Sequence, residues 1–533
     1  PELDASEIEG QLAELAQRGW LTPIGDRYRF ARPALREALY RSLEPERRRE
    51  LHSLAADALR PSDNSRRLPL TDAIQRAFHL RSAGRNADLL RVIRPLLEVL
   101  LRRGQPQRVI VLARWGLEAL GSLTHTRQRN RWRIEFLEAA ADASDRLGAR
   151  TEQRRWLDEL SDLEFDPAQD PDALSRVYLL HGRYAAGTGQ YGLARGMYKN
   201  AVELAQRAQS EELESEALRR LGAVQAHVGE LESAREHLTR ARDIAVHDAQ
   251  RAVALIQLGI VELLENKLES ALACVDRALR LQRASRRFQL PGITAAGHML
   301  RGRIYRIFGR PGRALGSMQR AVDLARQAGE RRLEMEATAR LGGLLLDLNR
   351  PDQAQSRLRE ALLIAGEIED RRGQTLGSLW LGTLLWEQGD PSAASVLERA
   401  SRLAGEMGLK RAEALAFSIR ARIAREAGET ARTLEWTAHA QQLLEHQGAE
   451  LIDRIVVIGT RALVLESAGR ADEALELVRE LRRRMRRDNE AIADPSLRAS
   501  HGDAMARLLD AVLSPLGVIY PRVTDEAAPS QLA

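Results

Sequence analysis

Apolar and polar positions along residues 346–365 predict a helix end, a sharp corner and a new helix. The stretch reads LDLNRPDQAQSRLREALLIA, with Asn349 at the corner and Pro351 where the first turn of the second helix begins. Asn is one of the few residues that adopt a left-handed backbone cheaply. Asn349 is therefore either a hinge of the fold or part of a site, and other corners of the chain decide between the two.

The same corner recurs in a fixed register of small residues. A small residue is followed seven positions later by Gly or Asn, and then by alanines five and twelve positions further on. Six copies and two weaker ones follow this register, and in chain order they are Gly182, Gly189, Ala194, Ala201; Gly222, Gly229, Ala234, Ala241; Gly259, Asn266, Ala271, Ala278; Gly302, Gly309, Ala314, Ala321; Gly342, Asn349, Ala354, Ala361; Gly382, Gly389, Ala394, Ala400 (one place early); Ala421, Gly428, Thr433, Ala440; Ala462, Gly469, Ala474, Leu481.

First members of successive copies are 40, 37, 43, 40, 40, 39 and 41 residues apart. Such a regular period indicates a solenoid of stacked helix pairs. The first small residue lets the two helices of a pair cross closely, and the Gly or Asn takes the left-handed turn. Asn349 is thus predicted to be a hinge.

The spacing of these small residues resembles that of the tetratricopeptide repeat family over residues 172–487. The resemblance implies an all-α fold, a right-handed superhelix of helix pairs, with about eight repeats in residues 166–490. The period near 40 exceeds the roughly 34 residues usual in that family. We therefore expect longer helices in each pair.

Residues 1–60 follow a different pattern. An amphipathic helix with Ile8, Leu12 and Leu15 leads to GWLTPIGDRYRF, where two extended runs meet at residues 25–26 in a predicted hairpin. Two helices broken at Pro45 follow, so a winged-helix-like module is predicted. We expect irregular helical pairs over residues 61–165, then the array, a C-terminal capping helix over 491–524 and a disordered tail over 525–533.

Six residues of the first module resemble the segment that follows the ATPase core in bacterial STAND proteins, the signal-transduction ATPases with numerous domains. The matching residues are Phe30, Pro33, Leu35, Arg36, Glu37 and Tyr40. The resemblance spans residues 7–120 and implies an ATPase upstream, attached to a Ser/Thr kinase, a nucleotide cyclase or a LuxR-type domain. Arg32 stands where that family carries a histidine implicated in sensing nucleotide. Arg32 is therefore a nucleotide-sensor candidate, and whether it preserves sensing stays open.

Composition agrees with this picture and excludes several classes of protein. The chain is 44% hydrophobic but only 4% aromatic, which favours helical cores of Ala and Leu. Its 81 basic residues include only three Lys, and 75 acidic residues are interspersed with them, so the net charge of +6 is weak evidence for nucleic acid. The single cysteine, Cys274, excludes an internal disulfide and suits a cytoplasmic protein. No apolar run approaches a membrane span and no signal peptide opens the chain, whose first residue, Pro1, suggests a fragment.

Motifs for catalysis are absent from the sequence. A phosphate-binding loop needs Gly-Lys-Ser or Gly-Lys-Thr, but Lys199, Lys267 and Lys410 follow Tyr, Asn and Leu. No kinase catalytic loop, zincin helix or nucleophile elbow is present. His237 and His247 have no other ligand types nearby. We predict no catalytic residue, no metal site and no cofactor in this segment, with ATP bound only by an upstream domain.

The first helix of each pair is expected to line the concave face and to bind a partner there. Counting the first small residue as position eight, positions two, five, nine, twelve and thirteen point inward. The candidate binding residues at these positions are Arg176, Arg183, Arg219, Ile256, Ile260, Leu263, Met299, Arg303, Arg306, Trp386, Arg422 and Arg425. An apolar stripe between basic flanks suits an acidic or amphipathic peptide, or another domain of the same protein. The alternative is that tight curvature makes the stripe ordinary core.

Three functions remain open from the sequence. The first is a non-catalytic sensor and interaction arm that regulates an upstream ATPase and effector. The second is a free-standing repeat scaffold or peptide-responsive regulator without an ATPase. The third is nucleic-acid binding by the arginines at 482–484, 486 and 487, for which a solvated helix end, with Glu476 and Glu480 one turn back, is the favoured explanation. The expected partner is a protein or peptide and not a membrane.

Overall fold

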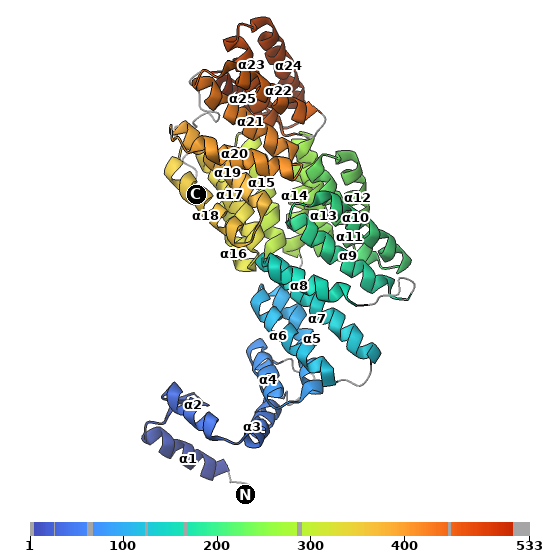
Figure 1. The fold of residues 1–533 in the computed structure, drawn as a ribbon, viewed down its shortest axis with the longest axis vertical. Coiled ribbons are helices and arrows are strands. Elements are labelled where there is room, and N and C mark those ends of the chain that lie inside the picture. The colour runs from blue at the N-terminus through green and yellow to red at the C-terminus, as the bar shows by residue number, and fades with distance from the viewer. Residues whose placement is uncertain are drawn as a thin grey trace. The chain divides into compact units, whose positions relative to one another are not determined.

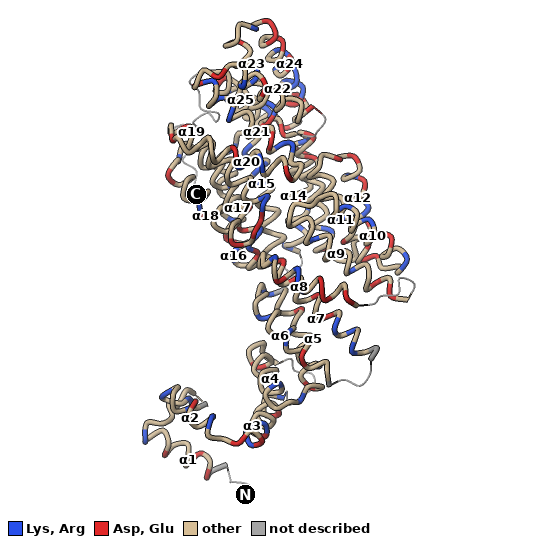
Figure 2. Tube along the Cα trace, viewed as in Figure 1, with Lys and Arg blue, Asp and Glu red and all other residues tan. Residues whose placement is uncertain are grey.

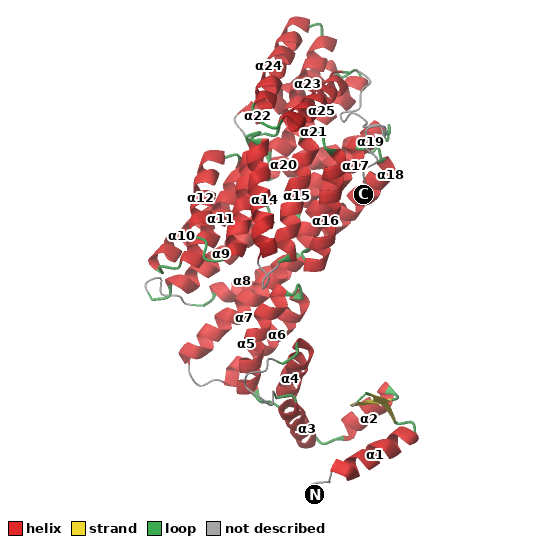
Figure 3. Ribbon diagram, turned by 180° about the vertical axis from the view of Figure 1, so that it is seen from behind, coloured by secondary structure: helices red, strands yellow, loops and turns green. Residues whose placement is uncertain are grey.

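The computed structural model describes residues 5–25, 27–60, 68–122, 126–163, 169–284, 290–445 and 449–514. In these ranges the chain forms 25 α-helices, one short 3-10 helix at Leu120–Ser122 and two strands (Figures 1 and 3). Two compact units are present: residues 1–99 with 112–136, and residues 100–111 with 137–533. Each unit is described by itself. The predicted disordered tail lies outside the described residues.

The N-terminal unit begins with a helix, a short hairpin and two further helices. Their bounds are α1 (Ala5–Gln17), β1 (Leu21–Ile24), β2 (Arg27–Phe30), α2 (Pro33–Ser42) and α3 (Pro45–Ala58). The strands are antiparallel and pair Leu21 with Phe30, which confirms the predicted hairpin. Helix α2 has no buried residue. This small region thus has little core of its own, and its winged-helix identity stays a prediction.

Five further helices precede the array. They are α4 (Leu70–Ser82), α5 (Asn86–Arg102), α6 (Pro106–Ala119), α7 (Thr126–Leu147) and α8 (Arg150–Ser161). In the N-terminal unit, Tyr40 hydrogen-bonds His52 through its hydroxyl (2.9 Å), and His52 in turn hydrogen-bonds His79 through the Nδ1 atoms (2.8 Å). This chain of contacts joins α2, α3 and α4.

Sixteen helices of the second unit form eight consecutive pairs. The pairs are α9 (Pro171–Gly187) with α10 (Tyr191–Arg207), α11 (Glu211–Val228) with α12 (Leu231–Asp243), α13 (Asp248–Leu264) with α14 (Leu268–Ala284), α15 (Pro291–Ile307) with α16 (Pro311–Ala328), α17 (Arg331–Asp347) with α18 (Pro351–Glu367), α19 (Arg371–Glu387) with α20 (Ala393–Glu406), α21 (Lys410–Glu426) with α22 (Thr430–Glu445), and α23 (Leu451–Ser467) with α24 (Ala471–Glu490). Helix α25 (Pro495–Leu513) packs on α23 and α24. The predicted all-α, tetratricopeptide-like solenoid is confirmed.

All eight predicted corner residues have a left-handed backbone. Their φ angles lie between 54° and 90°, at Gly189, Gly229, Asn266, Gly309, Asn349, Gly389, Gly428 and Gly469. Pro311 and Pro351 begin α16 and α18, as their fixed φ favours. Helix α20 begins later, at Ala393, because the Asp390 carboxylate accepts hydrogen bonds from the Ser392 backbone N–H and hydroxyl and prolongs the turn.

In five of the pairs, the first small residue is a glycine that lies where a side chain of the second helix fills the space beside it. A Cβ atom added at Gly182, Gly302 or Gly342 would lie 2.5–2.9 Å from the side chains of Tyr198, Met318 and Leu358, respectively. Gly222 and Gly382 meet Leu238 and Leu397 in the same way. The glycine thus admits a large side chain that a Cβ would exclude.

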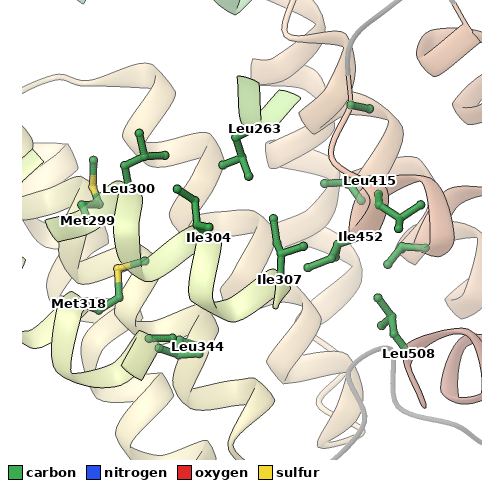
Figure 4. Close-up of a cluster of buried hydrophobic side chains, with 14 of the residues drawn as sticks. Leu263, Met299, Leu300, Ile304, Ile307, Met318, Leu344, Leu415, Ile452 and Leu508 are labelled. Atoms are coloured by element: carbon green, nitrogen blue, oxygen red, sulfur yellow. The ribbon is translucent and has the colours of Figure 1, made fainter. Parts of the chain in front are cut away.

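A single hydrophobic cluster joins α13 to α25. It runs from Ala252 to Val512, and Figure 4 shows Ile307 of α15 pointing toward Ile452 of α23. Successive repeats therefore share one core. None of the described helices is long and apolar enough to cross a membrane.

Corners of the second unit also touch residues that come 183 to 224 positions later in the chain. A Cβ on Gly104 would lie 2.5 Å from the carbonyl oxygen of Ala328, and one on Gly309 would lie 2.6 Å from that of Ser500. Gly148 lies against Ile368 and Gly189 against Met407. Asn266 hydrogen-bonds the backbone of Ala449 and Leu451. We call these five contacts the seam, because they join early and late parts of the second unit.

Acid should weaken the last part of the array through His501. His501 is 1% exposed, its Nδ1 donates to the Asn489 Oδ1 at 2.9 Å, and burial lowers its pKa to about 4. Because the unfolded chain takes up this proton near pH 6.5, the stabilisation is complete above that pH and is lost as pH falls toward 4. Between pH 7 and 5 the free energy of unfolding should fall by about 2 kcal/mol more in the wild type than in His501→Gln. Denaturant titrations at both pH values measure the difference, and equal pH slopes would contradict the prediction.

Candidate functional site: an inner cavity of the array

A cavity of about 330 Å³ lies inside the second unit. Its walls come from the first helices of seven successive pairs, α11 to α23, together with the residues that lead into them. The volume falls at the lower end of the range for ligand pockets. Part of the lining is apolar, and the apolar residues include Ile256, Ile260, Leu264, Met299, Ile307, Leu333, Leu379, Leu415 and Ile419.

A first charged cluster in the cavity is centred on Glu336 of α17. Its carboxylate is 2.9 Å from the guanidinium of Arg340 and 3.4 Å from that of Arg372. Burial disfavours the charge, but Arg372 and Arg340 outweigh burial and hold the pKa of Glu336 well below its usual value. Burial, with Arg303 nearby, lowers the pKa of Arg340 to about 10. The cluster therefore carries two arginines for one carboxylate.

A second charged cluster is centred on Glu450, the residue just before α23. Its Oε1 accepts hydrogen bonds from Arg303 of α15 (2.6 Å) and Arg411 of α21 (2.8 Å). Arg411 also forms an ion pair with Asp453 at 2.5 Å. Burial opposes the charge of Glu450, yet Arg411 and Arg303 hold its pKa below the usual value. Burial and the charge of Glu450 together outweigh Arg411 and raise the pKa of Asp453 to about 6.

The cavity has an excess of positive charge. A fifth lining arginine, Arg306, is paired with Asp347 at 2.5 Å. Four arginines then face three acids, and the excess grows when Asp453 takes up a proton. Along the chain as a whole, by contrast, Lys and Arg are interspersed with Asp and Glu (Figure 2). An anion with an apolar body is the ligand that such walls favour.

Five of the twelve candidate residues lie together in this cavity: Ile256, Ile260, Met299, Arg303 and Arg306. All five belong to α13 or α15, the middle of the predicted stripe. Whether they bind a partner stays a prediction. Their positions are compatible with a binding surface, because Ile260 and Arg306 are only partly buried.

Three candidate arginines at the start of the array pair with acids instead. Arg176 contacts Glu138 (3.0 Å), and Arg183 contacts Asp145 (2.5 Å), both on α7. Arg219 pairs with Glu216 of its own helix at 2.6 Å. These arginines hold neighbouring helices or turns together.

Four further candidates lie outside the lining of the cavity. Leu263 is fully buried in the core. The indole Nε1 of Trp386 donates to Glu426 (3.2 Å), and Arg422, which is 1% exposed, bonds Thr460 (3.3 Å) and the carbonyl of Val512. Arg425 is half-buried in the last turn of α21.

Arg32, the nucleotide-sensor candidate, is exposed at the N-cap of α2 in the N-terminal unit. The arginines at 482, 483, 486 and 487 are exposed on α24, while Arg484 lies 3.9 Å from Asp488. No group of three His, Cys, Asp or Glu within the described ranges is placed to hold a metal ion.

Six charged residues of the cavity were not among the candidates: Glu336, Arg340, Arg372, Arg411, Glu450 and Asp453. The candidate positions were counted in a register that suits shorter repeats. In the longer helices of this chain, the inward face begins before the first of those positions. Arg332, Arg372 and Arg411 all lie ten residues before the first small residue of their pairs. This recurrent arginine was the signal in the sequence that could have revealed the cluster.

The comparisons with known proteins agree with the fold. A tetratricopeptide repeat model matches residues 213–284. The match covers α11 to α14, the two pairs that contain Gly222 and Gly259. No curated protein matches the chain.

Several solved structures resemble the chain at low identity. A Rap protein complexed with Competence and Sporulation Factor is 16% identical, with a TM-score of 0.52, over 68% of this chain and 99% of that one. Aspartyl phosphate phosphatase F from Bacillus subtilis is 11% identical, with a TM-score of 0.41, over 69% of this chain and 96% of that one. A STAND protein with a tetratricopeptide repeat sensor from Pyrococcus horikoshii is 16% identical, with a TM-score of 0.38, over 80% of this chain and 60% of that one. The first of these likenesses shows a shared fold.

Proposed function

We propose that the array is a protein-interaction module whose inner cavity receives an acidic, apolar peptide segment of a partner. The observation that carries this proposal is the cavity itself, whose lining combines many apolar residues with more arginines than acids. An extended chain can place carboxylates against the guanidinium groups and its apolar side chains against Ile256, Ile260 and Met299. The fold shared with the Rap protein complexed with Competence and Sporulation Factor also supports a ligand-responsive array.

Filling the cavity should abolish this binding. We define an acidic pool of fluorescein-labelled hexapeptides made of Asp, Glu, Leu and Ile, and a basic pool with Lys in place of the acids. The acidic pool should bind the wild type more tightly than the basic pool in fluorescence anisotropy. Ile260→Trp, which places an indole in the cavity, should weaken that binding at least tenfold, or about 1.4 kcal/mol.

Leu363→Trp is the matched control, because Leu363 is 65% exposed on α18 and outside the cavity. This variant should bind the acidic pool as the wild type does. Equal binding of the two pools, or full binding by Ile260→Trp, would contradict the proposal.

We further propose that the array is the non-catalytic sensor arm of a STAND-type signalling protein. The resemblance of residues 7–120 to that family supports this assignment. So does the exposure of large apolar side chains in the N-terminal unit, among them Trp20 (46%), Ile24 (46%) and Leu54 (59%), which suit packing on another folded domain. Ligand in the cavity would then shift the populations of two states of the upstream ATPase.

The gene upstream of the first codon provides a direct test of this second proposal. A strand followed by a Gly-rich loop ending in Gly-Lys-Ser or Gly-Lys-Thr is expected there. A start codon immediately before the first residue would contradict the STAND assignment and favour a free-standing repeat scaffold.

A further inference from the structure

Asn266 makes seam contacts on both sides of Glu450, a residue that lines the cavity. Asn266 forms the corner between α13 and α14 with a φ of +60°. Its side-chain Oδ1 accepts from the Leu451 backbone N–H (2.8 Å), and its Nδ2 donates to the Ala449 carbonyl (3.4 Å). Glu450 lies between these two bonds. The corner of an early repeat thus fixes the backbone on both sides of Glu450.

The side chain of Glu450 occupies the arginines that an anionic ligand would need. Glu450 is 7% exposed, and its carboxylate lies between Arg303 and Arg411. Arg303 is 8% exposed, and its Nε has no hydrogen-bond partner although it is buried. A carboxylate from the chain itself is therefore present where the cavity is best suited to a carboxylate from a ligand.

The corner does not need an asparagine at position 266. Gly serves at six of the eight corners, and Asn349 is the other asparagine, with a φ of +54°. In the described part of the chain the Asn349 side chain makes no hydrogen bond. What Asn266 supplies beyond a left-handed turn is the pair of bonds that hold residues 449 and 451.

Departure of Glu450 without a replacement would be costly. Arg303, Arg340, Arg372 and Arg411 would then share the cavity with only two acids, Glu336 and Asp453. The positive charge of Arg303 already lowers the pKa of Arg340. Mutual repulsion in a buried site favours keeping Glu450 in place until another anion arrives. Without ligand, the carboxylate of Glu450 therefore stays between Arg303 and Arg411.

We infer that Glu450 is an internal competitor for the anionic group of the cavity ligand, and that Asn266 holds it in the cavity. This inference rests on the proposed function. An incoming carboxylate replaces Glu450 on Arg303 and Arg411, and Glu450 leaves with its backbone, which breaks both bonds to Asn266. Binding in the cavity and opening of the seam are then coupled, and each favours the other.

The hold by Asn266 is tested on the full chain without ligand. Hydrogen exchange of the Leu451 amide, which donates to Asn266, is compared in Asn266→Gly, Asn349→Gly and the wild type. Both substitutions keep a residue that favours a positive φ, so both proteins should fold. Exchange should be at least tenfold faster in Asn266→Gly and unchanged in Asn349→Gly. Equal protection of the Leu451 amide from exchange in all three proteins would overturn the proposal that Asn266 holds Glu450 in the cavity.

The competitor role is tested by binding of the acidic pool. Glu450→Gln keeps the size of the side chain and leaves Arg411 paired with Asp453. Affinity should rise about tenfold in Glu450→Gln and in Asn266→Gly, and stay at the wild-type value in Asn349→Gly. If the wild type binds the acidic pool and Glu450→Gln binds it no more tightly, the competitor role is overturned and the proposed function stands. If none of these proteins binds the acidic pool, both the proposed function and the competitor role are overturned. Hydrogen exchange of the Leu451 amide still tests whether Asn266 holds Glu450 in the cavity.

Discussion

Gly148→Ala should lower the free energy of unfolding of the array by about 3 kcal/mol. Gly148 follows α7 with a φ of +71°, which costs a residue with a Cβ atom about 1–2 kcal/mol. The new Cβ would also overlap the side chain of Ile368, across the seam, and over-packing of this kind costs about 1–3 kcal/mol more. Chemical denaturation followed by circular dichroism measures the loss.

Gly389→Ala separates the two causes. Gly389 has a φ of +72° at the corner between α19 and α20, and a Cβ added there meets nothing within 4 Å. This control should lose only about 1 kcal/mol, the cost of the backbone conformation. If the free energy of unfolding falls by a similar amount in the two variants, the Cβ added at Gly148 does not overlap Ile368.

Asp370→Ala should cost about 3 kcal/mol as well, for an electrostatic reason. Asp370 is the N-cap of α19, where its Oδ1 accepts from the Gly373 backbone N–H at 2.8 Å. Its Oδ2 lies 2.9 Å from the Nε of Arg332, and its side chain is 1% exposed. Alanine removes the cap and leaves Arg332 without its carboxylate. Because the Arg332 side chain is 34% exposed, water offsets part of that loss.

Asp494→Ala provides the matched control for the cap alone. Asp494 caps α25 by accepting from the Leu497 backbone N–H at 2.9 Å, and Asp494 is exposed. Its replacement should cost about 1 kcal/mol. Thermal unfolding of the two variants and of Asp370→Asn, which keeps the cap without the charge, measures the part due to Arg332. Equal costs for Asp370→Ala and Asp494→Ala would refute the contribution of the ion pair.

Local features of the fold could be predicted from the sequence because few residue types satisfy them. A left-handed corner favours Gly or Asn, so residues such as Asn349 identify the corner within each pair of the array. Close crossing of paired helices requires a small residue, so Gly182 and Gly342 identify the first helices. A fixed period then orders the pairs along the solenoid.

The seam and most of the charged cavity could not be predicted in this way. Which corner meets which depends on the rotation added by every repeat, so Gly148 and Ile368 share no local signal. Glu450 enters the cavity from outside the repeat register, and Arg372 lies before the first inward position of a shorter repeat. The candidate residues that line the cavity accordingly all lie in α13 and α15.

The seam also limits how such an array can change in evolution. In an open solenoid, repeats contact only their neighbours, so a pair of helices can be duplicated or deleted anywhere with local consequences. In this protein, each seam corner from Gly104 to Gly309 has a partner 183 to 224 residues later. A pair inserted between the two would move every later corner out of register with its partner. New repeats can therefore be added without loss only before Gly104 or after Ser500, and the part of the chain between them is fixed in length by its own closure.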